Sequence, residues 1–211
     1  MKLQVSFDRV DLESAFPLLE KLYDVADIIE IGTPFIFREG MRAIGEIRKK
    51  YPDLILLADM KIMDGGNKNA SMAFDSGADI VTVLAVANDS TLEEALKAGQ
   101  KYHKEIFVDM IAVKNLVERV KETDQMGVDY IGVHTGVDLQ ATGKTPVEQL
   151  GELVLAVKKA KTAVAGGITV NMLPGIAVLK PEIVICGQSI LSCADPRGAA
   201  LEIKKTMRQY G

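Results

Sequence analysis

Short runs rich in β-branched residues alternate with longer amphipathic segments along the whole chain, and this alternation is what most restricts its fold. Eight runs predict strands, at residues 3–7, 27–31, 54–59, 79–84, 106–110, 130–134, 162–165 and 183–186. Eight segments between them predict helices, at residues 12–23, 38–49, 67–76, 91–102, 115–126, 146–159, 170–178 and 196–209. Such regular alternation is typical of a parallel sheet with helical crossovers.

The number of predicted strands and helices indicates the architecture. Eight strands and eight helices in 211 residues predict a (β/α)8 TIM barrel in which residues 1–211 form a single domain. A doubly wound open sheet is the alternative, and its dinucleotide-binding form would carry G-x-G-x-x-G after the first strand, where this chain has SFDRVD. Helix stop signals precede several predicted strands, at Pro52, Gly77, Gly127 and Pro181.

Composition excludes several classes of partner. The chain is 48% hydrophobic and has a net charge of -4 without a basic block, which argues against a nucleic-acid or membrane surface and favours a small-molecule partner. The two cysteines form no C-x-x-C pair, and we expect Cys186 and Cys193 to be reduced, with Cys186 buried in a strand. The chain begins with MKLQVSFD and no apolar leader, so we expect a cytoplasmic protein.

In a barrel, function lies at the carboxyl ends of the strands, and polar residues occupy those positions here. The candidate residues on the first six strands are Asp8, Glu30, Asp59, Lys61, Asp109 and His134. Within LADMKIMDGG, Asp59 and Lys61 are two residues apart and point to the same side, whereas Asp64 must lie on the loop beyond the strand.

The number of carboxylates predicts a cation. A single aspartate after a strand is usually a helix cap or part of a surface ion pair, but four strand-end carboxylates together weaken that explanation. Close carboxylates raise each other's pKa unless a cation lies among them, and their oxygens are ligands that Mg²⁺ prefers. Lys61 would neutralise part of this charge and a metal ion the rest.

The last two strands end in glycines instead. These glycines, Gly166, Gly167 and Gly187, either allow tight turns or let a phosphate approach backbone N–H groups. Their place after strands seven and eight favours phosphate binding.

His134 is either a structural histidine or a general acid or base, and its strand-end position favours a catalytic role. Lys61 could form a Schiff base, but flanking carboxylates should keep it protonated, so we expect an electrostatic role.

The string DMKIMDGG matches the D-x-K-x-x-D motif, and the chain resembles the orotidine 5'-phosphate decarboxylase suprafamily. Within that suprafamily it resembles the formaldehyde-fixing aldolases, through LQVSFD, DIIEIGTPFI, GADIVTVL, FVDMI, GVDYIGVHTGVDLQA, KTAVAGGI and CGQSI. The resemblance implies a reversible aldol reaction of the ribulose monophosphate pathway, a lyase activity that joins D-ribulose 5-phosphate and formaldehyde into D-arabino-hex-3-ulose 6-phosphate through an ene-diolate.

The resemblance also implies roles for individual residues. It implies that Glu30 and Asp59 hold Mg²⁺ or Mn²⁺, with Asp59 also catalytic, and that Asp8, Lys61 and Asp109 contact the sugar. It places Gly166, Gly167, Gly187 and Gln188 around the phosphate. It further implies a homodimer with shared active sites, in which Asp64 serves the neighbouring subunit. We expect His134 to be the base that removes a proton next to the ketose carbonyl.

Two other functions compete with this one. A 3-keto-L-gulonate-6-phosphate decarboxylase would share the strand-three motif and the ene-diolate, but that group carries an arginine in the loop after the strand-six histidine and another where Gln188 stands. This chain has HTGVDLQA and no arginine at either place. A non-catalytic phosphosugar-binding barrel would keep the glycines and lose the acidic residues, all of which are present.

Overall fold

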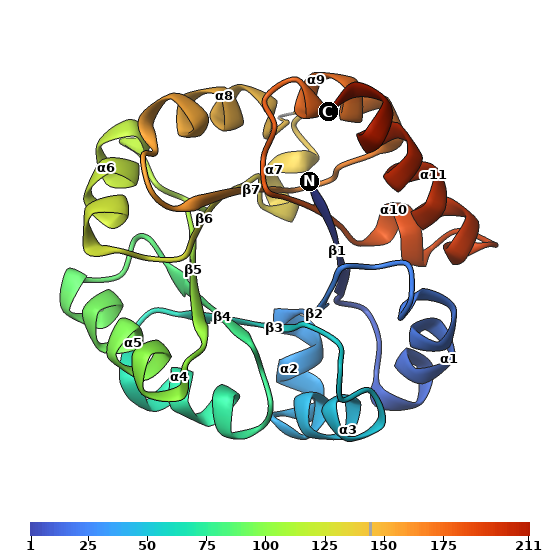
Figure 1. Ribbon diagram of the computed structural model, residues 1–211, viewed down its shortest axis with the longest axis horizontal. Coiled ribbons are helices and arrows are strands. Elements are labelled where there is room, and N and C mark those ends of the chain that lie inside the picture. The colour runs from blue at the N-terminus through green and yellow to red at the C-terminus, as the bar shows by residue number, and fades with distance from the viewer. Residues whose placement is uncertain (144) are drawn as a thin grey trace.

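The computed structural model describes residues 1–143 and 145–211 and shows a closed barrel of eight parallel strands in sequence order (Figure 1). Each strand pairs with the next and β8 pairs with β1. The strands are β1 (Lys2–Phe7), β2 (Ile28–Ile31), β3 (Leu56–Ile62), β4 (Ile80–Leu84), β5 (Glu105–Asp109), β6 (Tyr130–His134), β7 (Lys161–Ala165) and β8 (Ile183–Cys186). The predicted (β/α)8 barrel is confirmed.

The longer helices surround this barrel as an outer ring (Figure 1). The longer ones are α1 (Leu12–Leu22), α3 (Arg42–Lys50), α4 (Gly66–Asp75), α5 (Asp89–Tyr102), α6 (Leu116–Met126), α8 (Val147–Ala156) and α11 (Pro196–Tyr210). The shorter ones are α2 (Thr33–Glu39), α7 (Val137–Gln140), the 3-10 helix η1 (Val170–Met172), α9 (Leu173–Ala177) and α10 (Gln188–Leu191). In the described part of the chain, none of these helices has the length and apolar character needed to span a bilayer.

All the predicted strands and helices are present, and the structure adds three short helices. The helix predicted over 38–49 is wrong at its start, because Arg38 and Glu39 end α2 and α3 begins at Arg42, and the helix predicted over 146–159 ends early, at Ala156. Helices α2, α7 and α10 were not predicted, because helices of four to seven residues are too short to show an amphipathic period. The expectation of one helix over 170–178 is wrong in detail, since a 3-10 turn precedes α9. Strand β3 runs to Ile62, three residues beyond its predicted end, because its pairing with β4 shifts register after Ala58.

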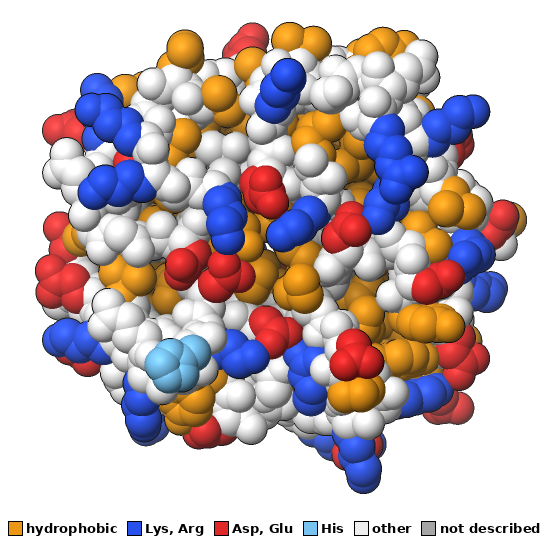
Figure 2. Space-filling model, in the orientation of Figure 1, with side chains coloured by type: hydrophobic (Ala, Val, Ile, Leu, Met, Phe, Trp, Pro, Cys, Tyr) orange, Lys and Arg blue, Asp and Glu red, His pale blue; other side chains and the backbone are white. Residues whose placement is uncertain are grey.

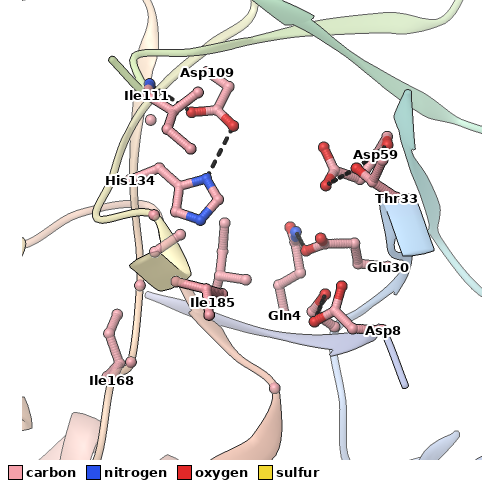
Figure 3. A pocket seen from close by; sticks show the side chains of 18 of the residues that line it. Gln4, Asp8, Glu30, Thr33, Asp59, Asp109, Ile111, His134, Ile168 and Ile185 are labelled. Carbon is pink, nitrogen blue, oxygen red and sulfur yellow. Dashed lines mark hydrogen bonds and ion pairs between the residues drawn. The ribbon is translucent and has the colours of Figure 1, made fainter. Parts of the chain in front are cut away.

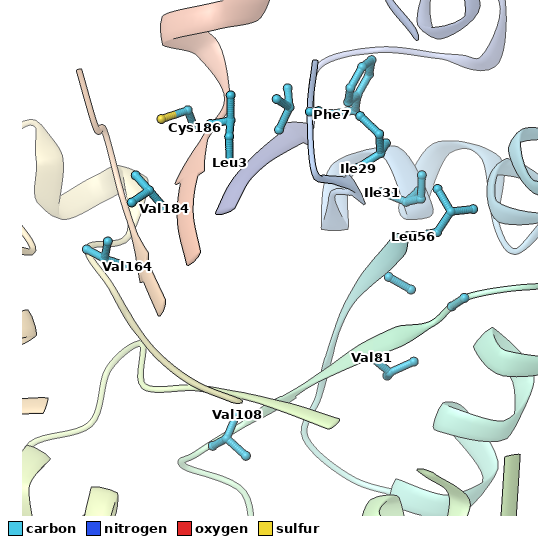
Figure 4. Packing of buried hydrophobic residues seen from close by; sticks show 14 of the residues in the cluster. Leu3, Phe7, Ile29, Ile31, Leu56, Val81, Val108, Val164, Val184 and Cys186 are labelled. Carbon is cyan, nitrogen blue, oxygen red and sulfur yellow. The ribbon is translucent and has the colours of Figure 1, made fainter. Parts of the chain in front are cut away.

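Alternate residues of each strand point outward and form the main core between barrel and helices (Figure 4). The outward-facing residues in this cluster are apolar, among them Leu3, Phe7, Ile29, Ile31, Val81, Val108, Val164 and Val184. Cys186 belongs to the same cluster and burial raises its pKa to about 12, as expected for a structural thiol, whereas Cys193 is exposed. Both cysteines are free, as predicted.

The inward-facing residues change character along the barrel. A second apolar cluster fills the interior near the start of the strands, with Ile28, Leu57, Ile80, Phe107, Tyr130, Ala163 and Ile183. Two residues further along, the same inward phase brings Glu30, Asp59, Thr82 and Asp109. Apolar packing therefore closes one end of the barrel, and polar groups occupy the other.

Glycine at position 132 keeps this interior packing possible. A Cβ atom on Gly132 would lie 2.3 Å from Cζ of Phe107, whose ring stacks on Tyr130 at a centroid distance of 6.1 Å.

The face of the molecule in Figure 2 carries acidic, basic and apolar side chains intermixed, with no large block of one charge.

Candidate active site

A cavity of about 680 Å³ opens at the carboxyl ends of the strands. It is lined by ten of the predicted site residues, Asp8, Glu30, Asp59, Lys61, Asp109, His134, Gly166, Gly167, Gly187 and Gln188. Parallel strands place their carboxyl ends at one face, so residues that are far apart in sequence converge there. Asp64 is the one predicted residue that does not line this cavity.

Lys61 lies between two buried carboxylates. Its Nζ atom is 2.8 Å from Oδ2 of Asp59 and 3.1 Å from Oδ2 of Asp109, and both aspartates are almost fully buried. Burial alone would lower the pKa of Lys61, but the two carboxylates outweigh it and raise the pKa above its ordinary value. The side chain is therefore a permanent ammonium, which supports an electrostatic role over Schiff-base chemistry.

His134 is held by Asp109, one of the two aspartates that pair with Lys61 (Figure 3). Its Nδ1 atom lies 3.0 Å from Oδ2 of Asp109, whose Oδ1 accepts a hydrogen bond from the backbone N–H of Ile111 at 2.9 Å. Burial lowers the pKa of His134, and Asp109 more than reverses this, so the pKa is raised. A neutral ring that donates from Nδ1 keeps the lone pair of Nε2 available to a substrate.

Glu30 and Asp8 form the acidic side of the cavity opposite His134 (Figure 3). Glu30 is 7% exposed and accepts a hydrogen bond from Nε2 of Gln4 at 2.5 Å. Burial and the neighbouring charges of Asp59 and Asp8 raise the pKa of Glu30 to about 8. Burial and Asp59 also raise the pKa of Asp8. These carboxylates are thus close enough to repel each other.

The charges that line the cavity do not balance. Four carboxylates, on Asp8, Glu30, Asp59 and Asp109, face two cations, on Lys61 and Arg9, among the described lining residues. Buried carboxylates without a counter-ion are costly, and Oε1 of Gln4 is a further buried acceptor without a partner in the described structure. This donor set fits a hard divalent cation.

The geometry limits what kind of metal site this is. Within residues 1–143 and 145–211, no three acidic, histidine or cysteine side chains come together as a complete metal site. Mg²⁺ commonly uses one or two carboxylates and takes its remaining ligands from water and substrate. Glu30 and Asp59, on adjacent strands, fit such a partial ligand set.

The glycine side of the cavity has backbone conformations that other residues would not adopt easily. Gly166 and Gly167 have φ values of +111° and +65°. A Cβ atom on Gly166 would lie 2.4 Å from the carbonyl oxygen of Thr135. Gly187 and Gln188 lie at the end of neighbouring β8 and line the same region. Backbone atoms are therefore exposed to the cavity on this side, as a phosphate-binding loop requires.

Asp64 lies beyond the end of β3, as predicted, and is exposed. Its carboxylate accepts a hydrogen bond from the N–H of Gly65 at 2.7 Å, and its carbonyl accepts one from Asn69 at 2.8 Å. The side chain thus belongs to the loop before α4 and lies outside the cavity of its own chain.

Comparisons with known proteins agree with this geometry. The family model for the orotidine 5'-phosphate decarboxylase / HUMPS family matches residues 1–203. The chain belongs to that family. The resemblance carried by DMKIMDGG is therefore confirmed.

Members of the family differ in how similar they are to this chain. A 3-hexulose-6-phosphate synthase of Bacillus subtilis strain 168 is 45% identical over 209 residues, which cover 99% of this chain and 100% of the relative. The crystal structure of a 3-hexulose-6-phosphate synthase from Salmonella typhimurium is 43% identical, with a TM-score of 0.97 and full coverage of both chains. A 3-keto-L-gulonate-6-phosphate decarboxylase from Vibrio cholerae is 25% identical, with a TM-score of 0.89, over 100% of this chain and 98% of the other.

Two threonines that contact Asp59 in the cavity were not predicted from the sequence. Oγ1 of Thr33 donates to Oδ2 of Asp59 at 2.8 Å, and Oγ1 of Thr82 donates to Oδ1 of Asp59 at 2.8 Å. Thr33 begins the unpredicted helix α2, so nothing marked it as part of the site. Thr82 shares the inward phase of Ile80, and this alternation could have identified it.

The pair formed by His134 and Asp109 predicts a measurable titration. In an Asp109→Asn variant, loss of the carboxylate charge lowers the pKa of His134 toward or below its ordinary value of 6.5. The chain has only two histidines, so the ring signals of His134 and the exposed His103 can be followed separately by NMR. An Asp138→Asn variant, altered at an exposed position outside the cavity, is the matched control. Identical His134 titrations in the wild type and Asp109→Asn would contradict the pairing.

Proposed function

We propose that this chain is an aldehyde-lyase with 3-hexulose-6-phosphate synthase activity, which joins D-ribulose 5-phosphate and formaldehyde into D-arabino-hex-3-ulose 6-phosphate. The observation that carries the proposal is the 45% identity to a 3-hexulose-6-phosphate synthase over its full length. The cavity supports the proposal because it combines a glycine-lined side, a buried cation and a histidine base. The 25% identity to a decarboxylase is far lower, and neither Gln188 nor HTGVDLQA supplies that enzyme's arginines.

Substrate binding uses opposite sides of the cavity. The phosphate of D-ribulose 5-phosphate lies against the backbone of Gly166, Gly167, Gly187 and Gln188, where glycine permits close approach. The ketose then extends toward the acidic side, where Asp8 and Asp109 contact its hydroxyl groups. This orientation places the carbonyl end of the sugar near Lys61 and His134.

Chemistry begins with loss of a proton. Nε2 of His134 takes the proton from C1 of ribulose 5-phosphate, next to the C2 carbonyl, and the electron pair forms an ene-diolate. The ammonium group of Lys61, fixed by Asp59 and Asp109, stabilises the developing negative charge. C1 then attacks the formaldehyde carbon, and the new alkoxide takes the proton back from Nε2 of His134, which regenerates the base and completes the hexulose phosphate.

A divalent cation, Mg²⁺ or Mn²⁺, is part of this proposal. Glu30 and Asp59 would hold it, supported by the excess of buried carboxylates at this side of the cavity. When bound, it would supply positive charge that stabilises oxygens of the ene-diolate. Thr33 and Thr82 orient the carboxylate of Asp59 from two sides, which keeps it in place as a ligand.

A cytoplasmic homodimer with shared active sites completes the proposal. Asp64 is exposed and outside its own cavity. The adjacent Met63 is 53% exposed and Met72, on the following helix α4, is 41% exposed, so both offer apolar surface to a partner. Asp64 would act in the partner subunit's active site. The free cysteines suit a reducing compartment.

The activity is tested by incubating purified protein with Mg²⁺, ribulose 5-phosphate and ¹³C-formaldehyde. We expect loss of formaldehyde and appearance of the label at C1 of the hexulose phosphate by NMR. Lys61→Ala should lower kcat by roughly 100-fold or more, because it removes a buried charge that stabilises the intermediate. No consumption of formaldehyde, together with CO₂ release from 3-keto-L-gulonate 6-phosphate, would overturn the proposal in favour of the decarboxylase.

Subunit complementation tests whether Asp64 acts across the dimer. We expect Asp64→Ala and Lys61→Ala to be nearly inactive alone, whereas coexpression creates heterodimers in which one site keeps both residues. Random pairing leaves one intact site in every four, so the mixture should regain about one quarter of wild-type activity. If Asp64 acted within its own chain, both sites of each heterodimer would be defective and the mixture would stay inactive.

A further inference from the structure

Strand β3 contains an irregularity at the position of the active-site lysine. Ala58 pairs with Val81 of β4, and the next pair is Ile62 with Val83. Three residues of β3, Asp59, Met60 and Lys61, therefore lie opposite the single residue Thr82. Such a bulge interrupts the regular ladder of hydrogen bonds and redirects the side chains of the bulged strand.

The backbone of Lys61 adopts an unfavourable conformation within this bulge. Its φ value is +43°, in the left-handed region that residues with a Cβ atom rarely occupy. Such conformations persist only where surrounding contacts hold them, and they gather at functional sites. In β3, the conformation accompanies a side chain that reaches past β4 to Asp109 on β5 at 3.1 Å.

The hydroxyl group of Thr82 provides the holding contacts. Its Oγ1 atom accepts the backbone N–H of Lys61 at 2.9 Å and donates to Oδ1 of Asp59 at 2.8 Å. Thr82 is 4% exposed, so water cannot readily replace either bond. One buried hydroxyl thus fixes both the backbone of the lysine and the carboxylate with which that lysine pairs.

We propose that Thr82 is a positioning residue for catalysis, whose hydroxyl group holds the bulge of β3 so that Lys61 and Asp59 face the ene-diolate. This inference rests on the proposed function, since it concerns the placement of that reaction's cation. Valine has nearly the shape of threonine but can form neither bond. Serine keeps the hydroxyl group and loses only a methyl group.

Kinetics of Thr82→Val and Thr82→Ser test the proposal. We expect Thr82→Val to lower kcat by roughly 10- to 100-fold while KM for ribulose 5-phosphate changes less than about threefold, since misplacement of a group that acts in the transition state affects kcat. Thr82→Ser should keep most of the wild-type kcat. Thr162→Val, at a buried strand position of β7 outside the cavity, is the matched control and should leave both constants unchanged.

Amide hydrogen exchange gives a readout that does not depend on activity. The N–H of Lys61 should exchange faster in Thr82→Val than in wild type or Thr82→Ser, because its acceptor is gone. Equal kcat and equal Lys61 exchange in wild type and Thr82→Val would overturn the inference. An inactive wild type would instead count against the proposed function, and the exchange measurement would still decide the role of Thr82.

Discussion

Carboxylates buried at the mouth of the barrel have to be compensated by positive charge, and most features of the site follow from this requirement. Asp59 and Asp109 share the ammonium group of Lys61, and Asp109 also pairs with His134. Glu30 has no cationic partner among the described residues, and its raised pKa reflects burial and the nearby charges of Asp59 and Asp8. Lys61 and His134 therefore compensate Asp109 and part of the charge of Asp59, and the acidic charge that remains around Glu30, Asp59 and Asp8 fits the proposed cation.

Along each strand, the residues that form the apolar core and the residues that line the cavity occupy different positions. Outward-facing residues pack against the helices, and inward-facing residues change from apolar to polar within one step of the pleat, as from Leu57 to Asp59. Space for the polar groups depends on glycine: a Cβ atom on Gly32 would lie 2.1 Å from Oδ1 of Asp8. Polar residues can vary at this end without disturbing the core that closes the other end.

Local patterns in the sequence predicted the repeating elements well. Each β-branched run became a strand, and strand-end position alone identified the acidic residues, His134 and the glycines as cavity residues. The place of the glycines after β7 and β8 also predicted a phosphate site, whereas the metal ligands, the contact of Gln188 with phosphate and the role of Asp64 came from family resemblance. All of these stay predictions.

Features that depend on contacts between strands could not be predicted in this way. The bond from His134 to Asp109 joins residues 25 positions apart, and no local pattern encodes it. The bulge in β3 depends on Thr82 of β4, and the regular alternation by which Asp59 and Lys61 were predicted to share a face gives no sign of it. Helix α2 begins with Thr33 and Pro34, a recognisable start signal, but its short length concealed the helix.

Urea unfolding of wild type and Glu30→Gln, in EDTA and in Mg²⁺, tests most directly whether the buried carboxylates require a divalent cation. In EDTA at about pH 9, above the raised pKa of Glu30 of about 8, Glu30→Gln should be the more stable protein, because it removes an ionised buried carboxylate that is repelled by its neighbours. Mg²⁺ at 100 times its Kd should stabilise wild type by about 2.7 kcal/mol, and the variant should gain much less. Equal gains from Mg²⁺ in the two proteins, or a variant less stable than wild type in EDTA, would contradict this requirement.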